Sequence, residues 1–173
     1  MRRLLRGTPT VLFAAGLLLA ATGCRSSQVW FSNDDDLTTV LTDHMDTATE
    51  TLDVAVYTFT SEEIRDAIID ADSRGVAVRV IIDLWATNDP IAASLDEAGV
   101  PTKRSAGYAG EGGDPGIMHH KFAVVDGRSV ATGSFNFTLS ADGKNYENLL
   151  IVTDPALAGQ YTNAFAEIWK KAD

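Results

Sequence analysis

The chain has 173 residues, of which 45% are hydrophobic and 22% charged, and its formal net charge is −10 at pH 7. This length suits one domain with a full hydrophobic core. After residue 6 the chain has no run of basic side chains, which argues against the broad basic face of a general nucleic-acid binder. Any anionic substrate must therefore be held by a local positive site, against the field of the whole protein.

Residues 1–23 have the pattern of a secretory signal peptide. Arg2, Arg3 and Arg6 form a basic start, and residues 11–21 are all apolar or small. That run is about half of the ~20 residues that a membrane-spanning helix needs. A basic segment followed by a short apolar one is typical of a signal peptide, rather than of a membrane anchor or a buried core helix.

Cys24 is the only cysteine and follows this segment as Ala21-Thr22-Gly23-Cys24. A lone cysteine in an exported protein cannot form an internal disulfide. The stretch resembles a bacterial lipoprotein signal, although Ala21 stands where such signals usually have Leu, so ordinary cleavage near Gly23 stays open. We expect lipidation of Cys24 and an exported, lipid-anchored domain in the periplasm or outside the cell. Without residues 1–23 the net charge becomes −13, from 11 basic and 24 acidic side chains.

Hydrophobic spacing predicts alternating strands and helices over the rest of the chain. The first half of the chain predicts a candidate first strand at 29–31 in a linker at 24–32, a helix at 37–48, a strand at 52–59, and a helix from a capping box at Thr60-x-x-Glu63 to Gly75. A strand at 76–84, a helix at 89–99, a strand at 100–105 and a mobile glycine-rich loop at 107–116 follow. The last part predicts a hairpin around Asp126-Gly127, a strand at 149–153 and a final helix from Asp154-Pro155. Right-handed crossovers make the early strands parallel, and the hairpin adds an antiparallel part. The predicted fold is therefore a three-layer α/β/α sandwich with a mixed sheet, formed by one domain at 33–173.

A group of polar residues on the hairpin is the candidate for chemistry. Side chains two apart in a strand share a face, so His119 and Lys121 project together, as do Ser134 and Asn136 on the next strand. A two-residue turn at Asp126-Gly127 would place His119 opposite Ser134 and Lys121 opposite Thr132. The ammonium and the polar donors could then hold phosphate oxygens, while His119 attacks phosphorus or moves protons.

Several neighbouring residues have a second interpretation. Asp126 is explained by turn chemistry and lies a whole strand from His119. Glu147 is the better partner to orient the imidazole of His119; the alternative is a solvated carboxylate at the strand edge. His120 points to the opposite face, and His44 on an apolar helical stripe is expected in the core. No Cys, Asp or Glu stands beside the paired histidines at metal-ligand spacing, so no metal site and no cofactor are expected.

The spacing His119-x-Lys121-(x4)-Asp126-(x6)-Gly133-Ser134-x-Asn136 resembles the motif of the phospholipase D superfamily, and Asn145 to Asn148 resembles its continuation. The resemblance covers about residues 117–152. It implies the phospholipase D-like fold and a metal-independent phosphodiesterase that forms a phosphohistidine. Together with the residues themselves, it makes His119, Lys121, Asp126 and Glu147 the candidate catalytic residues, and Lys121, Ser134 and Asn136 the candidate phosphate ligands. Family members use two motif histidines, so a chain with one motif implies a homodimer with a composite active site.

Three functions are compatible with this motif. Short single-motif members resemble bacterial endonucleases without sequence preference, and the small size favours that interpretation. The alternative is a phospholipase D acting on phosphatidyl lipids, which the acidic charge and the lipid anchor favour. The third is an envelope protein that binds phosphate or nucleic acid without turnover, against which the complete motif argues. Nucleic acid is the favoured substrate and phospholipid the second.

Overall fold

The computed structural model describes residues 25–86, 88–110, 112–113 and 115–173. The predicted signal peptide and Cys24 lie outside the described residues. The helices are α1 (Leu37–Asp46), α2 (Glu62–Ser73), α3 (Asp89–Glu97), α4 (Leu139–Gly143) and α5 (Pro155–Trp169). The strands are β1 (Ser26–Phe31), β2 (Thr51–Val56), β3 (Ala77–Asp83), β4 (Thr102–Ala109), β5 (Pro115–Ile117), β6 (Lys121–Val125), β7 (Ser129–Gly133) and β8 (Asn148–Thr153).

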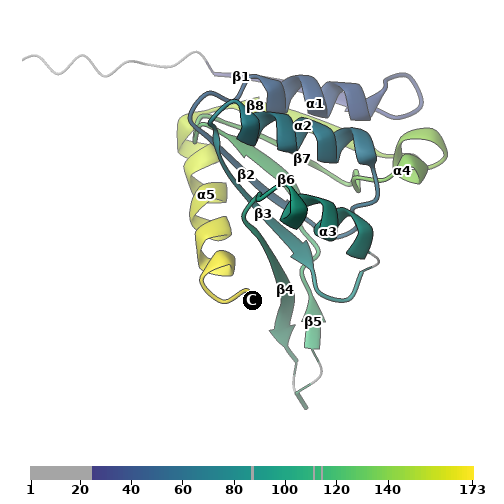
Figure 1. The fold of residues 1–173 in the computed structure, drawn as a ribbon. Helices are drawn as coiled ribbons and strands as arrows, with labels where there is room; N and C mark the ends of the chain where they lie inside the picture. Colours follow the sequence, from purple (N-terminus) through teal and green to yellow (C-terminus); the bar gives the residue numbers. More distant parts are fainter. Residues whose placement is uncertain (1–24, 87, 111, 114) are drawn as a thin grey trace, which may run out of the picture.

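These strands form one mixed sheet in the order β1-β8-β7-β6-β2-β3-β4-β5. Strands β2, β3 and β4 are parallel, as the helical crossovers require, and the other neighbouring pairs are antiparallel. Helices α1, α2 and α3 cover one face of the sheet and α5 covers the other (Figure 1). The predicted three-layer α/β/α fold with a mixed sheet is therefore confirmed.

Two hydrophobic cores result from the alternation of side chains along the strands. The larger one lies under α1, α2 and α3 and includes Leu41, Ile68 and Val80. The smaller one lies under α5 and includes Phe122 and Phe165. Both faces of the central strands are thus covered, which explains why β2 and β3 read as nearly continuous apolar runs.

Helix α2 begins one residue later than its sequence pattern predicts. The side chain of Ser61, not that of Thr60, accepts a hydrogen bond from the N–H of Ile64. Thr60 instead donates its N–H to the carbonyl of Phe137, in the segment that follows the motif. The backbone pairing of Thr60 with a distant segment therefore moves the N-cap to Ser61, a shift that local capping rules cannot foresee.

The glycine-rich segment is largely an antiparallel arm, not the mobile loop that its composition predicts. Residues 106–109 of β4 face 115–117 of β5, and the pair extends beyond the body of the sheet (Figure 1). A Cβ atom at Gly107 would come within 2.5 Å of the carbonyl oxygen of Ile117. Glycine here therefore permits the close approach of two strands, which is one of its established uses inside a strand.

The β6–β7 hairpin has one residue more in its loop than predicted. Asp126 and Gly127 have φ angles of +52° and +60°, the conformation that a tight hairpin turn requires. Val125 nevertheless pairs with Ser129, and Phe122, not Lys121, pairs with Thr132. The predicted opposition of His119 to Ser134 is therefore wrong, because a shift of one residue exchanges the faces of a strand.

Across the described ranges, no helix combines the length and the apolar character that crossing a membrane would need.

Candidate active site

The site forms where the carboxyl ends of β2 and β3 meet the start of β6. Tyr57, directly after β2, donates its N–H to the carbonyl of His120 at 2.9 Å. Asp83, the last residue of β3, is fully buried, and its Oδ2 accepts the N–H of Met118 at 2.7 Å. Two strands far away in sequence therefore hold both sides of His119. Carboxyl ends of parallel strands are the usual place for ligands in α/β sheets.

Asn88 fixes the base of the site from the start of α3. It is fully buried, and its Nδ2 donates to the carbonyl of Tyr57 at 2.9 Å. Its Oδ1 accepts the N–H of Phe59 at 2.7 Å, and Nδ2 also lies 3.3 Å from the carbonyl of Asp83. One amide thus satisfies backbone groups from both strand ends, so the backbone around Tyr57 and Asp83 is held rigidly.

His119, Lys121 and Tyr57 form a compact cluster. The Nζ of Lys121 lies 3.3 Å from Nε2 of His119 and donates to the carbonyl of His119 at 3.0 Å. The imidazole lies against the ring of Tyr57, with centroids 4.6 Å apart. Lys121 Nζ is 5.3 Å from the same ring centroid, within the range of a cation–π contact. The predicted pairing of His119 with Lys121 is therefore present, although β6 begins only at Lys121.

Lys121 lies in a mixed electrostatic environment. Burial lowers the pKa of its ammonium below the ordinary 10.5, while the negative charge of Glu147 acts in the opposite direction. The two groups therefore sense each other's charge, which connects the His119 cluster to the segment that follows β7.

Ser134 and Glu147 form a second cluster. The hydroxyl of Ser134 donates to Oε2 of Glu147 and accepts the N–H of Asn148 at 3.1 Å. The other carboxylate oxygen of Glu147 accepts from Nδ2 of Asn145 at 3.3 Å. A hydroxyl has one proton, so Ser134 has none left for phosphate in this arrangement. Among the described residues no hydrogen bond joins Glu147 to His119; the two carboxylate oxygens of Glu147 accept instead from Ser134 and Asn145.

Gly133 explains why β7 ends just before Ser134. A Cβ atom at this position would collide with the carbonyl oxygen of Asn148. Only glycine lets the end of β7 approach the start of β8 so closely, and this approach brings Ser134 to Asn148 and Glu147.

Asn136 has a polar atom without a partner. Its Oδ1 is buried and makes no hydrogen bond, although a buried amide oxygen normally has one. The other end of this amide, Nδ2, carries two N–H donors, which is the chemistry that a phosphate oxygen accepts.

Asp126 is at the opposite end of β6. Its carboxylate accepts the N–H groups of Thr49, Glu50 and Thr51 at 2.8 to 3.2 Å, and the hydroxyl of Thr49. Burial alone would raise the pKa of Asp126, but the N–H donors of Thr51, Glu50 and Thr49 outweigh it and hold the pKa below its ordinary range. Asp126 therefore joins the hairpin to the start of β2 and lies away from His119.

The other two histidines lie apart from this cluster. His120 packs edge to face on Phe122 at 5.4 Å, on the α5 side. Burial, followed by the charges of Lys121 and His119, lowers the pKa of His120. His44 is half-buried on α1 beside Ser129, and burial lowers its pKa to about 4. Within the described ranges no group of three His, Cys, Asp or Glu side chains is arranged to hold a metal ion.

Sequence reasoning missed Tyr57, Asp83 and Asn88. Tyr57 directly follows β2 and Asp83 ends β3, and both apolar runs were predicted as parallel strands. Their place at the carboxyl ends of parallel strands was the available signal. Asn88 had no signal of this kind, because its partners are backbone groups up to 31 residues away in sequence.

A family model described as "Cardiolipin synthase, PLD-like domain" matches residues 41–169. A mitochondrial cardiolipin hydrolase of Chlamydomonas reinhardtii is 34% identical over 148 residues, which are 85% of this chain and 64% of that protein. The Xenopus tropicalis protein of the same name is 42% identical over 127 residues, 73% of this chain and 58% of that protein. The chain thus spans less than two thirds of the length of these relatives.

Among solved structures, the phospholipase D family member Nuc of Salmonella typhimurium has the same fold. The TM-score is 0.77 at 28% identity, over 86% of this chain and 97% of Nuc. The sequence match, the shared fold and the cluster of His119 and Lys121 agree. The chain belongs to the phospholipase D superfamily, through its PLD-like domain.

Proposed function

We propose that this protein hydrolyses phosphodiesters through a covalent intermediate on His119. The observation that supports this most is the contact between His119 and Lys121, with Nζ 3.3 Å from Nε2. A phosphate bound there would be held by a fixed cation beside a nucleophile, which are the two groups that such a reaction needs. Tyr57, Asp83 and Asn88 hold this geometry before substrate arrives.

The chemistry uses side chains alone. A neutral imidazole of His119 forms a bond to phosphorus, and the bond between phosphorus and the leaving oxygen breaks. A second, protonated imidazole gives its proton to that oxygen. Water then attacks the phosphohistidine, the phosphorus–nitrogen bond breaks, and the proton of the water returns to the second imidazole. Lys121 and the amide of Asn136 stabilise the negative charge on the phosphate oxygens.

We further propose that the second imidazole is His119 of a second copy of the chain. His120 packs on Phe122, and His44 lies on α1 beside Ser129, so neither is placed to protonate a leaving group at His119. A two-fold axis beside the site would bring two copies of His119 face to face. Two neighbouring imidazoles resist double protonation, so one stays neutral while the other is charged.

Two substrate classes fit a phosphodiesterase of this family. The short single-motif chain favours nucleic acid. The names of the two cardiolipin hydrolases, together with a net charge of −10, favour a phospholipid. Hydrolysis of the soluble diester bis(p-nitrophenyl) phosphate in EDTA tests the activity without choosing between them.

His119→Ala should lower this hydrolysis at least ~10³-fold, as expected for a covalent nucleophile. His120→Ala is the matched control, one residue away and outside the cluster, and should keep most of the activity. Equal losses in the two variants, or activity that EDTA removes and zinc or magnesium restores, would contradict the proposed mechanism.

We also propose that the protein is exported and anchored by a lipid on Cys24. The support is the basic and apolar start of the chain followed by a lone cysteine. Mass spectrometry of the mature protein should find a lipid-modified N-terminal Cys24, and Cys24→Ser should abolish the modification. A mature N-terminus elsewhere, with an unmodified thiol at Cys24, would refute the anchor.

A further inference from the structure

A groove of about 530 Å³ runs from the histidines along α5. One wall is the β4–β5 arm and the other is the C-terminal half of α5, with His119 and His120 at one end. We call it the α5 groove. Its aliphatic lining consists of Leu84, Ala106, Ile117, Met118, Ala164 and Ile168. A volume of this size lies in the range of small-molecule sites, roughly 300 to 1,000 Å³.

Large apolar side chains of the α5 groove are open to solvent. Leu84 is 42% exposed, Ile117 is 45% exposed and Tyr108 is 87% exposed. Packing within the chain does not account for these exposed groups at the ends of β3, β4 and β5. Apolar surface that gathers around a groove beside reactive side chains marks a place for an apolar ligand.

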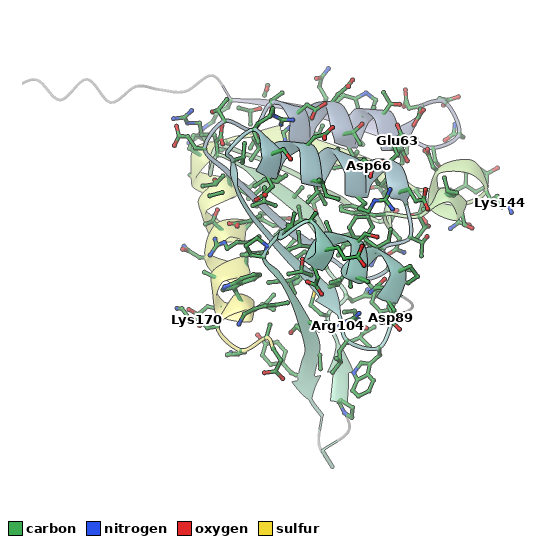
Figure 2. The ribbon with its side chains drawn as sticks, viewed as in Figure 1. Glu63, Asp66, Asp89, Arg104, Lys144 and Lys170 are labelled. Atoms are coloured by element: carbon green, nitrogen blue, oxygen red, sulfur yellow. The ribbon has the colours of Figure 1, made fainter. Side chains whose placement is uncertain are left out.

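The charges of the α5 groove do not suit a polyanion. Besides the histidines, the described lining residues with ionisable side chains include the basic Arg104 and Lys171 and the acidic Glu167 and Asp173. Arg104 is already bound at 2.7 Å to Asp89, the first residue of α3, and Figure 2 shows the two side by side. Lys171 lies 5.7 Å from the ring centroid of Tyr108. A nucleic-acid strand would need a row of cations and several stacking rings, and the groove offers one tyrosine.

We propose that the α5 groove binds the acyl chains of a phospholipid whose phosphate lies at His119 and Lys121. This inference rests on the proposed function, because it takes His119 as the place of the phosphate. His119 is part of the lining of the α5 groove, so a substituent of a phosphate bound there that points along α5 meets the aliphatic lining. Removing the methylenes of that substituent from water favours binding.

Substitutions on α5 test this proposal with a matched control. Ala164 is exposed and lines the α5 groove, so Ala164→Trp should fill it without disturbing the core. Its neighbour Asn163 is equally exposed and lies outside the groove, so Asn163→Trp adds the same ring elsewhere. Equal melting temperatures would show that both variants fold alike.

The readout is the kcat/KM of the purified full chain on dioleoyl- and dihexanoyl-phosphatidylglycerol in detergent micelles. Ala164→Trp should lower the ratio of long-chain to short-chain kcat/KM about tenfold or more, and Asn163→Trp should leave that ratio unchanged. An unchanged ratio in Ala164→Trp would overturn the proposal, as would a loss confined to cleavage of a single-stranded oligonucleotide.

Different results would contradict the assignment of the α5 groove and the proposed function. If the wild type hydrolyses bis(p-nitrophenyl) phosphate but neither lipid, the groove assignment falls and the proposed function stands. If no substrate is hydrolysed, or if hydrolysis does not depend on His119, the proposed function falls. Binding of dioleoyl-phosphatidylglycerol to the His119→Ala variant, measured by calorimetry, then still tests the groove: binding should weaken in His119→Ala/Ala164→Trp, and equal binding would overturn the assignment.

Discussion

The ammonium of Lys121 is surrounded by groups that fix its position. It contacts the Nε2 and the carbonyl of His119 and the face of Tyr57, and Glu147 acts on its charge from the other side. These contacts use one cation for two purposes. They orient the imidazole through the backbone and ring of His119, and they place a positive charge where the phosphate oxygens would lie.

Two substitutions of Lys121 distinguish the effect of its charge from the effect of its shape. Lys121→Met keeps the length of the side chain but removes the charge, and should lower kcat by about 10² to 10³, the scale found for one lost oxyanion donor. Lys121→Arg keeps the charge on a planar group of different reach, and should recover only part of the loss. Steady-state kinetics on bis(p-nitrophenyl) phosphate gives both values. Full activity in Lys121→Met would remove Lys121 from the mechanism.

The lowered pKa of His44 should make the stability of the fold depend on pH. Its pKa of about 4 in the folded protein lies below the ordinary 6.5, so the unfolded chain binds more protons between these values. Stability should therefore fall as the pH falls through this window, by about 2 to 3 kcal/mol between pH 7.5 and 4.5. Urea unfolding at the two pH values measures this loss, and His44→Gln should reduce it. Equal pH slopes in the two proteins would show that His44 is not the cause.

At the scale of elements, the ends of β2 and β3 hold the segment that contains His119. Asp83 is fully buried and accepts the N–H of Met118 from 35 residues away in sequence. Asp126 performs a comparable task at the other end of β6, where it accepts three N–H groups of the segment 49–51. Each carboxylate holds one end of β6 to another part of the sheet, but only Asp83 does so beside the site.

Asp83→Asn and Asp126→Asn should therefore lower the stability of the fold by similar amounts, but only Asp83→Asn should lower kcat. Each replaces a buried or partly buried carboxylate oxygen that accepts N–H groups, and each should cost about 1 to 3 kcal/mol. Asp83→Asn should also lower kcat, because Met118 and His119 are no longer fixed, whereas Asp126→Asn should keep kcat below its melting transition. Urea unfolding and kinetics check this pair. A similar fall of kcat in both variants would place Asp126 in the site after all.

The predictions from sequence were most accurate for regular elements and least accurate for contacts between distant segments. The helical stripes of α1, α2 and α5 and the apolar runs of β2 and β3 were visible because their periodicity is local. The arm was missed because Gly107 and Gly116 are typical of loops, and its pairing follows only from the approach of β4 to β5. The hairpin register failed by one residue because turn chemistry at Asp126-Gly127 does not fix the pairing of Ser129.

The same limit applies to the site. The His-x-Lys spacing was enough to bring His119 and Lys121 together, because the two are adjacent on one segment. The partners of Glu147 depend on the close approach of β7 to β8 at Gly133, which places Ser134 against its carboxylate. The roles of Tyr57 and Asp83 depend on the order of strands in the sheet, which the sequence pattern alone did not specify.

At the scale of the whole molecule, the proposed reaction needs two copies of the chain. One His119 supplies the nucleophile and the other supplies the proton for the leaving oxygen. A mixed dimer of wild-type and His119→Ala subunits, isolated with two different affinity tags, should therefore have almost no activity, because its single composite site lacks one imidazole. A doubly tagged wild-type dimer is the control. Half of the wild-type activity in the mixed dimer, or full activity from a monomer, would show that each chain holds a complete site.

The most direct test of the central claim is to trap the phosphohistidine. The wild-type protein should be mixed with a phosphodiester, quenched within the first turnover in alkaline denaturant, and digested for mass spectrometry. The peptide that contains His119 should carry a phosphoryl group that keeps one ester substituent of the substrate, and this adduct should disappear on longer incubation and be absent from His119→Ala. Turnover by the wild type without any adduct on this peptide, together with continued turnover by His119→Ala, would contradict the central claim.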